Sequence, residues 1–171
     1  MTAIKMPSLM ASVEHVVRDV AEQLARVAFV VAPPVLRIAL ALPFFRSGLT
    51  RWDGFLSLSP SASYLFEEEF KLHIFGNLYN FPAPIVVAHL VGLAEITLPI
   101  LLVLGFATRF VALGLLIMTG TIQLVAPDGW ANFHLYWAAL ALAIMAIGPG
   151  RLSVDYVIGG LIPPVKSIGA S

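Results

Sequence analysis

Four long apolar stretches constrain the fold of this chain more than any other feature of its sequence. They cover residues 27–49, 84–104, 108–125 and 130–147. A helix of about 20 apolar residues crosses the roughly 30 Å of hydrocarbon in a bilayer. The 171-residue chain is 59% hydrophobic and 12% charged, whereas soluble domains have about 45–50% apolar and about 25% charged residues. A water-soluble fold of this size cannot bury that excess. We therefore predict an all-α integral membrane protein, a four-helix bundle in the lipid bilayer.

Two amphipathic segments accompany the four predicted spans. In residues 12–26, apolar side chains recur at helical spacing opposite a charged face. This pattern predicts an N-terminal helix lying on the membrane surface, although a short soluble helix fits it equally well. In the long link 50–82, Phe66, Phe70 and Ile74 share one helical face. We expect there an outer interfacial helix that lies across the mouth of the bundle.

These patterns divide the chain into three parts and indicate its orientation. Residues 1–26 form the predicted amphipathic segment, residues 27–158 the four-span membrane domain, and residues 159–171 a tail. Lys and Arg near the span ends are more frequent on the side that carries the N-terminal segment, the second link and the tail. Because basic residues accumulate on the cytoplasmic side of membrane proteins, we expect both termini in the cytoplasm.

Charge and residue type exclude several classes of function. The formal net charge is zero and the sequence pI is about 6.9, so no basic face is available for nucleic acid. The chain has no cysteine, which removes disulfides, thiolate metal sites and thiol relays. Its four histidines show no metal-ligand spacing, and we predict no metal site. One alternative remains, in which His89 and His134 face each other as haem ligands.

Ionisable side chains inside the predicted spans are candidate functional groups, because each is costly in lipid without a partner or a cavity. Glu95 lies in the middle of the second span, on the face that carries Ala88 and Gly92. Small residues allow close helix contact, so Glu95 should point into the bundle. Arg37 lies at a similar depth when both helices are counted from their cytoplasmic ends at about 1.5 Å per residue. We therefore predict a buried Arg37–Glu95 ion pair, which is either functional or serves only to fix the helix register.

A second candidate site lies near the outer ends of the helices. Spacings of three and four place Gln123 on one seam and His134 and Trp137 on another, and such seams face neighbouring helices. Trp52 and His89 come to a similar depth. We expect these five side chains to form a polar, aromatic pocket that opens outward beneath the interfacial helix, although an aromatic belt at the membrane interface explains the tryptophans equally well.

Several short motifs in this chain resemble the DoxX family of small bacterial membrane proteins, over about residues 34–157. They are Leu36–Ala41 leading into Phe44–Leu49, Ala94-Glu95 followed by Leu101–Arg109, and His134–Trp137 followed by Gly148–Asp155. The stretch Tyr64–Phe70 is similar to a DoxX subgroup found with metallophore-type peptide operons. The resemblance implies a four-helix protein of the bacterial inner membrane.

The resemblance leaves two functions open, because a fold does not determine its chemistry. The family takes its name from a subunit of a thiosulfate:quinone oxidoreductase, and some relatives resemble partners of superoxide-detoxifying complexes. This implies a quinone-interacting subunit, with His134, Gln123 or Trp52 bonding a ring carbonyl. The alternative is a non-enzymatic membrane partner that handles cargo, a peptide or a metallophore, or assists assembly. Both functions imply a protein partner or a homo-oligomer.

Overall fold

The computed structural model describes residues 6–161, with side chains for residues 12–160. The chain divides into two compact units, Met1–Ala32 and Pro33–Ser171. Most of the predicted tail 159–171 lies outside the described residues.

The first helix, α1, runs without interruption from Met6 to Leu49 and so belongs to both units. Its part in the first unit has every described side chain exposed up to Val31. A separate amphipathic helix ending at residue 26 was predicted, but the structure has no break there. Neither proline nor glycine stands near Arg26 or Val27, so nothing in the local sequence ends the helix.

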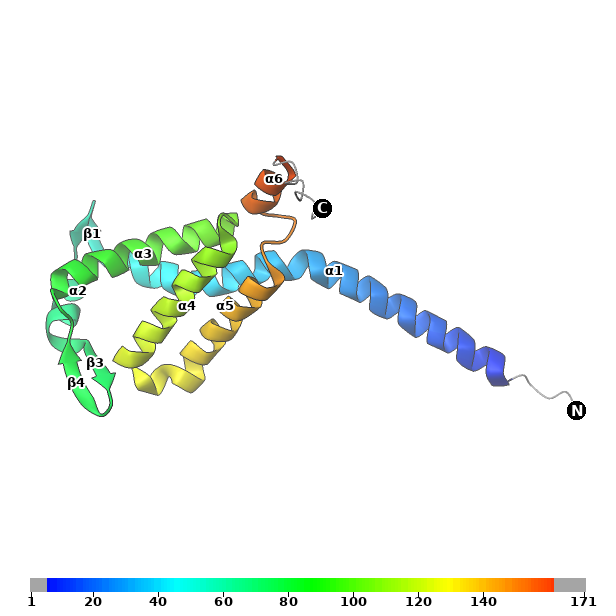
Figure 1. Cartoon of the computed structure of the whole chain (residues 1–171), viewed down its shortest axis with the longest axis horizontal. Coiled ribbons are helices and arrows are strands. Elements are labelled where there is room, and N and C mark those ends of the chain that lie inside the picture. The colour runs from blue at the N-terminus through cyan, green and yellow to red at the C-terminus, as the bar shows by residue number, and fades with distance from the viewer. Residues whose placement is uncertain (1–5, 162–171) are drawn as a thin grey trace, which may run out of the picture. The chain divides into compact units, whose positions relative to one another are not determined.

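The second unit contains the Pro33–Leu49 part of α1 and the remaining helices (Figure 1). Three of these helices are α3 (Pro84–Leu104), α4 (Thr108–Val125) and α5 (Leu135–Ile147). A 3-10 turn, η2 (Pro127–Gly129), and a π-helical turn, η3 (Trp130–His134), lead into α5, and α6 (Val154–Leu161) follows it. Four helical stretches of the described residues are long and apolar enough to cross a membrane, as expected for the predicted four-helix membrane protein. The fold was predicted to be all-α, whereas it is mostly helical with two short β-hairpins.

The link between α1 and α3 is only partly helical. It consists of a hairpin of β1 (Trp52–Gly54) and β2 (Ser57–Leu58), then α2 (Pro60–Tyr64), the π-helical turn η1 (Leu65–Glu69), and a hairpin of β3 (Lys71–Ile74) and β4 (Asn77–Asn80). The predicted interfacial helix therefore ends at Glu69, and Ile74 lies on a strand. The tight turn at Phe75 and Gly76, both with positive φ, pairs β3 with β4 antiparallel and so ends the helix early. We call the end of the bundle that carries this link the loop end. The opposite end, at residues 105–107, is the turn end.

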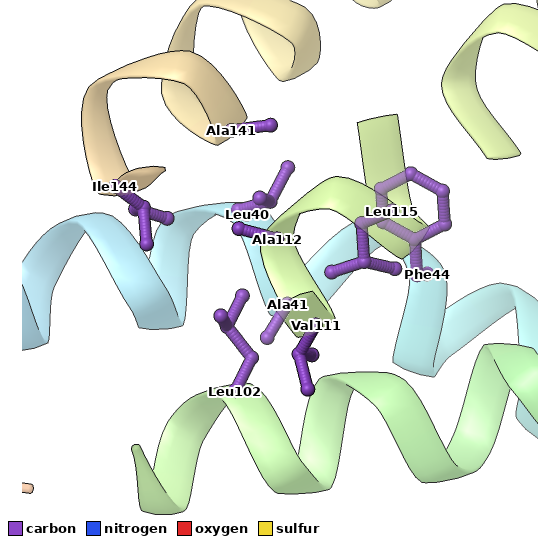
Figure 2. Packing of buried hydrophobic residues seen from close by; sticks show 9 residues of the cluster. All are labelled: Leu40, Ala41, Phe44, Leu102, Val111, Ala112, Leu115, Ala141 and Ile144. Carbon is purple, nitrogen blue, oxygen red and sulfur yellow. The ribbon is translucent and has the colours of Figure 1, made fainter. Parts of the chain in front are cut away.

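A compact hydrophobic core joins α1, α3, α4 and α5 (Figure 2). Leu40 and Phe44 of α1 meet Leu115 of α4, and α5 contributes Ile144. The full cluster is Leu40, Ala41, Phe44, Leu102, Val111, Ala112, Leu115, Ala141 and Ile144. In lipid, such an interface is held by close packing rather than by exclusion of water, so this core fixes the positions of the helices around the site described next.

Candidate functional site: a cavity beside a buried ion pair

A cavity of about 470 Å³ lies between α1, α3 and α4, towards the loop end. Most of its lining is apolar and comes from the facing sides of these three helices, with Trp137 contributed by α5. Aromatic side chains of the link, Phe66, Phe70 and Phe81, line it as well. Ligand pockets in proteins have about 300–1,000 Å³ and combine apolar walls with a few polar groups. The cavity has the size and character of a site for a small apolar molecule.

The charged groups on the cavity wall are Arg51 and Glu95. Arg51 Nε donates to Glu95 Oε2 at 3.0 Å, and Arg51 Nη2 donates to Glu95 Oε1 at 3.4 Å. The hydroxyl of Ser47 donates to the same Oε1 at 3.0 Å. The side chains of Arg51 and Glu95 are only 12% and 3% exposed. A two-pronged arginine–carboxylate pair of this kind is strong and geometrically specific, so the two side chains hold each other in place.

Two phenyl rings complete the surroundings of Arg51. Its guanidinium carbon lies 5.3 Å from the centre of the Phe66 ring and 5.8 Å from that of Phe70. Phe66 lies in η1 and Phe70 directly follows it, and their rings meet edge to face with centres 5.2 Å apart. A cation within about 6 Å of an aromatic face is attracted to it. The rings therefore shield the ion pair at the loop end while leaving it on the cavity wall.

The predicted Arg37–Glu95 pair is wrong. Both residues are buried, each 2% exposed as a whole residue, but their side chains have different partners. Arg37 Nε donates to the carbonyl of Pro33 at 3.4 Å, Nη1 donates to Val103 at 3.2 Å, and Nη2 donates to Leu152. These contacts place Arg37 level with the last turn of α3, whereas Glu95 lies two turns further into the helix. Arg37 and Glu95 therefore lie about two helical turns apart along α3 and do not pair.

A network at the turn end surrounds Arg37. Asp155 of α6 accepts hydrogen bonds from the backbone N–H groups of Ala107 and Thr108 at 2.7 and 2.8 Å and from the Thr108 hydroxyl at 2.7 Å. Burial by itself raises the pKa of Asp155, but these hydrogen bonds and the charge of Arg37 outweigh it and hold the pKa below its ordinary value. Asp155 thus caps the first turn of α4 from another part of the chain and ties α6 to the α3–α4 turn.

The five side chains predicted to form one pocket fall into two groups. In the first, His134 Nδ1 donates to Gln123 Oε1 at 2.6 Å, and the His134 ring lies 5.4 Å from Trp137. In the second, Trp52 lies edge-on to His89 at 6.0 Å. Of the five, Trp137 alone lines the cavity. Gln123, His134 and Trp137 lie together, Trp52 and His89 lie together, and the single five-residue pocket stays a prediction.

The histidines also have local hydrogen-bond partners. His89 Nδ1 bonds to the carbonyl of Ile85 at 2.8 Å, and His134 belongs to the Gln123 group. Within the described residues, the ring of His89 contacts Trp52 and that of His134 contacts Trp137, so the haem alternative gains no support from geometry. Among the described residues, no cluster of three or more histidine and acidic side chains could hold a metal ion.

Sequence reasoning missed Arg51 and Ser47 as site residues. Arg51 follows the last turn of α1, and its charge at a span end indicated only topology. A signal was nevertheless present, because Phe44, Ser47 and Arg51 follow one another at spacings of three and four and so share one face. Phe66 and Phe70 were predicted to share a helical face with Ile74. Their rings do meet, but Phe70 follows the helical turn and Ile74 lies on a strand, and their contact with a cation was not predicted.

Comparison with known proteins places the chain in a family without adding a known activity. A model of the DoxX family, described only by that name, matches residues 32–128. An uncharacterized protein of Haemophilus influenzae is 31% identical over 141 residues, which cover 75% of this chain and 84% of that protein. No solved structure matches the chain. The matched region contains Ser47, Arg51 and Glu95, whereas Trp137 lies beyond it.

Proposed function

The chain belongs to the DoxX family and is a multi-pass membrane protein, and we propose that its cavity binds a quinone within a larger membrane oxidoreductase or stress-response complex. One observation carries this proposal, namely an apolar cavity of about 470 Å³ with the hydrogen-bonded Arg51–Glu95 pair on its wall. A quinone needs an apolar slot with hydrogen-bonding groups for its ring oxygens, and this combination supplies both.

The ion pair suits both redox forms of such a ligand. Arg51 bonds to Glu95 through Nε and Nη2, so its Nη1 is the nitrogen that would donate to a quinone carbonyl. The Glu95 carboxylate can accept a hydrogen bond from the hydroxyl of the reduced form. This assigns carbonyl recognition to Arg51 rather than to His134, Gln123 or Trp52, because those three side chains do not line the cavity.

The entrance of the cavity favours a lipid-soluble ligand. Ile117 lines the cavity although its side chain is 63% exposed. It lies in the middle of the α4 span, where an exposed side chain faces lipid. The cavity therefore has an opening beside Ile117 towards the hydrocarbon. A quinone dissolved in the bilayer could enter by this side.

A partner protein is part of the proposal. The chain contains no cysteine, so any thiol relay that exchanges electrons with the quinone belongs to another subunit. We place the protein in the bacterial inner membrane with both termini in the cytoplasm, on the basis of its Lys and Arg distribution. Reporter enzymes that work only in the periplasm should be active when fused at residue 60 and inactive when fused at residues 106 and 160. Activity at residue 160 would contradict this orientation.

Co-purification tests the proposed ligand directly. Protein extracted in mild detergent should carry quinone that is detectable by mass spectrometry and by ultraviolet absorbance. Ala94 lines the cavity, and Ala139 is an exposed residue of α5. Ala94→Phe should fill the cavity and remove the bound quinone, whereas the matched variant Ala139→Phe should retain it. If both variants carry the same amount as the wild type, or if the folded wild type carries none and binds none when it is added, the alternative of a non-enzymatic membrane partner stands instead.

A further inference from the structure

The N-terminal unit carries an apolar stripe that the structure leaves uncovered. Between Val13 and Val31, six aliphatic side chains of α1 follow one another at alternating spacings of four and three residues. Each of them is 49–66% exposed. The six residues, which we call the heptad stripe, are Val13, Val17, Val20, Leu24, Val27 and Val31.

Two ion pairs mark the opposite side of the same helix. Arg18 Nε lies 3.3 Å from Glu22 Oε1, and Arg26 Nη2 lies 3.6 Å from Glu22 Oε2. In a heptad that has Val17 and Leu24 at position a, these three charged residues occupy positions b, f and c, which face away from a coiled-coil seam. Residues 12–26 thus have an apolar seam on one side and a charged face on the other, and the last two members of the stripe, Val27 and Val31, belong to the predicted span 27–49.

From these positions we infer that the heptad stripe is a self-association surface, on which copies of this chain form a parallel coiled coil. A strict repeat of 3.5 residues keeps the stripe facing a partner helix along its whole length. Copies inserted in one membrane share one orientation, so their N-terminal helices run parallel. In that arrangement Val16 lies opposite Ala21 of a neighbouring copy, and Gln23 lies opposite Ala28, so no like charges meet at these flanking positions.

The charge of the segment favours a second copy over the membrane surface that its amphipathic pattern first suggested. Residues 12–31 contain three carboxylates, Glu14, Asp19 and Glu22, and two guanidinium groups, Arg18 and Arg26. Helices that lie on membranes have polar faces rich in Lys and Arg, which attract anionic lipid. Anionic lipid repels a face with net negative charge. On the outside of a coiled coil, the same face is solvated by water.

Cysteine cross-linking tests the inference cleanly, because the chain has no native cysteine. Full-length protein with Val20→Cys, on the heptad stripe, should give a dimer-sized product with a short thiol-specific cross-linker in native membranes. Arg18→Cys, on the opposite face, should give none. In nanodiscs, the wild type should have a multiple of the protomer mass. Leu24→Asp should reduce it to one protomer, while the control Asp19→Asn should leave it unchanged.

Three outcomes would overturn the inference. Equal cross-linking at positions 18 and 20 would indicate random collisions. A wild type with the mass of a single protomer would exclude self-association. A fluorescent label at position 20 that is shielded by lipid, with no cross-linking there, would assign the stripe to the membrane surface. None of these outcomes depends on whether the cavity binds a quinone.

Discussion

Arg51, just after the end of α1, donates two hydrogen bonds to Glu95 in the middle of α3, at 3.0 and 3.4 Å. The pair joins the loop end to a membrane-spanning helix and lies on the wall of the cavity. It therefore links the stability of the bundle to the proposed ligand site.

A double-mutant cycle should detect this pair. Arg51→Met leaves the Glu95 carboxylate buried without its cation, which in a buried pair typically costs about 3–5 kcal/mol. Arg51→Met combined with Glu95→Leu should lose much less than the sum of the single losses, as measured by thermal unfolding in detergent. The cycle of Arg37→Met with Glu95→Leu should be close to additive, and Arg46→Met, at an exposed arginine of α1, serves as a control. Coupling of Glu95 to Arg37 rather than to Arg51 would refute the pairing.

Asp155 should make stability depend on acidic pH. Its folded pKa lies below its ordinary value of 3.8, so the native state favours the charged carboxylate. The stabilisation is fully present above the unfolded pKa and is lost as the pH falls through the folded pKa. Asp155→Asn should remove this part of the pH dependence below about pH 4 and cost about 0.5–2 kcal/mol at neutral pH, as capping residues do. An unchanged acid profile, measured by thermal unfolding across pH, would show that Asp155 does not cap α4.

Gly48 should tolerate no side chain. A Cβ atom at this position would lie 2.9 Å from the backbone carbon of Glu95 and 2.9 Å from a methyl group of Ile96. Gly48→Ala should therefore push α1 away from α3 and lower the free energy of unfolding by about 1–3 kcal/mol, the usual cost of overpacking. Gly120→Ala is the matched control, because a Cβ atom there has no neighbour within 4 Å. Equal melting temperatures of the two variants would contradict the close approach of the helices.

His134 should act in stability and not in ligand binding. His134→Ala removes a buried ring and leaves the partly exposed Gln123 side-chain oxygen without its donor, so the loss should be at the lower end of the about 1–3 kcal/mol that an unsatisfied buried group costs. Because His134 does not line the cavity, the affinity for a quinone should stay the same in protein that remains folded. If His134→Ala kept full stability but lost quinone binding, His134 would be a ligand-binding residue and this prediction would be wrong.

The sequence predicts the spans well and the polar contacts poorly, for separate reasons. Three predicted spans, 84–104, 108–125 and 130–147, match the helices because apolar length is a local property of the chain. The partner of Glu95 depends on the axial position of α1 relative to α3, which is not a local property of the sequence. The depth of Arg37 was counted from residue 27 as the start of its helix, whereas α1 begins at Met6. Arg37 lies level with Val103 at the end of α3, so the estimate was displaced by about eight residues, or about 12 Å at 1.5 Å per residue.

The quenching of Trp137 fluorescence by a quinone tests the central claim most directly. The chain has three tryptophans, of which Trp137 lines the cavity and Trp130 is exposed outside it. In nanodiscs, a variant that keeps only Trp137 (Trp52→Phe, Trp130→Phe) should show saturable quenching when a short-chain quinone is added. A variant that keeps only Trp130 (Trp52→Phe, Trp137→Phe) should show only a linear decrease, from quinone dissolved in the lipid. Ala94→Phe should abolish the saturable part. Identical linear quenching in both single-tryptophan proteins would contradict a quinone site in the cavity.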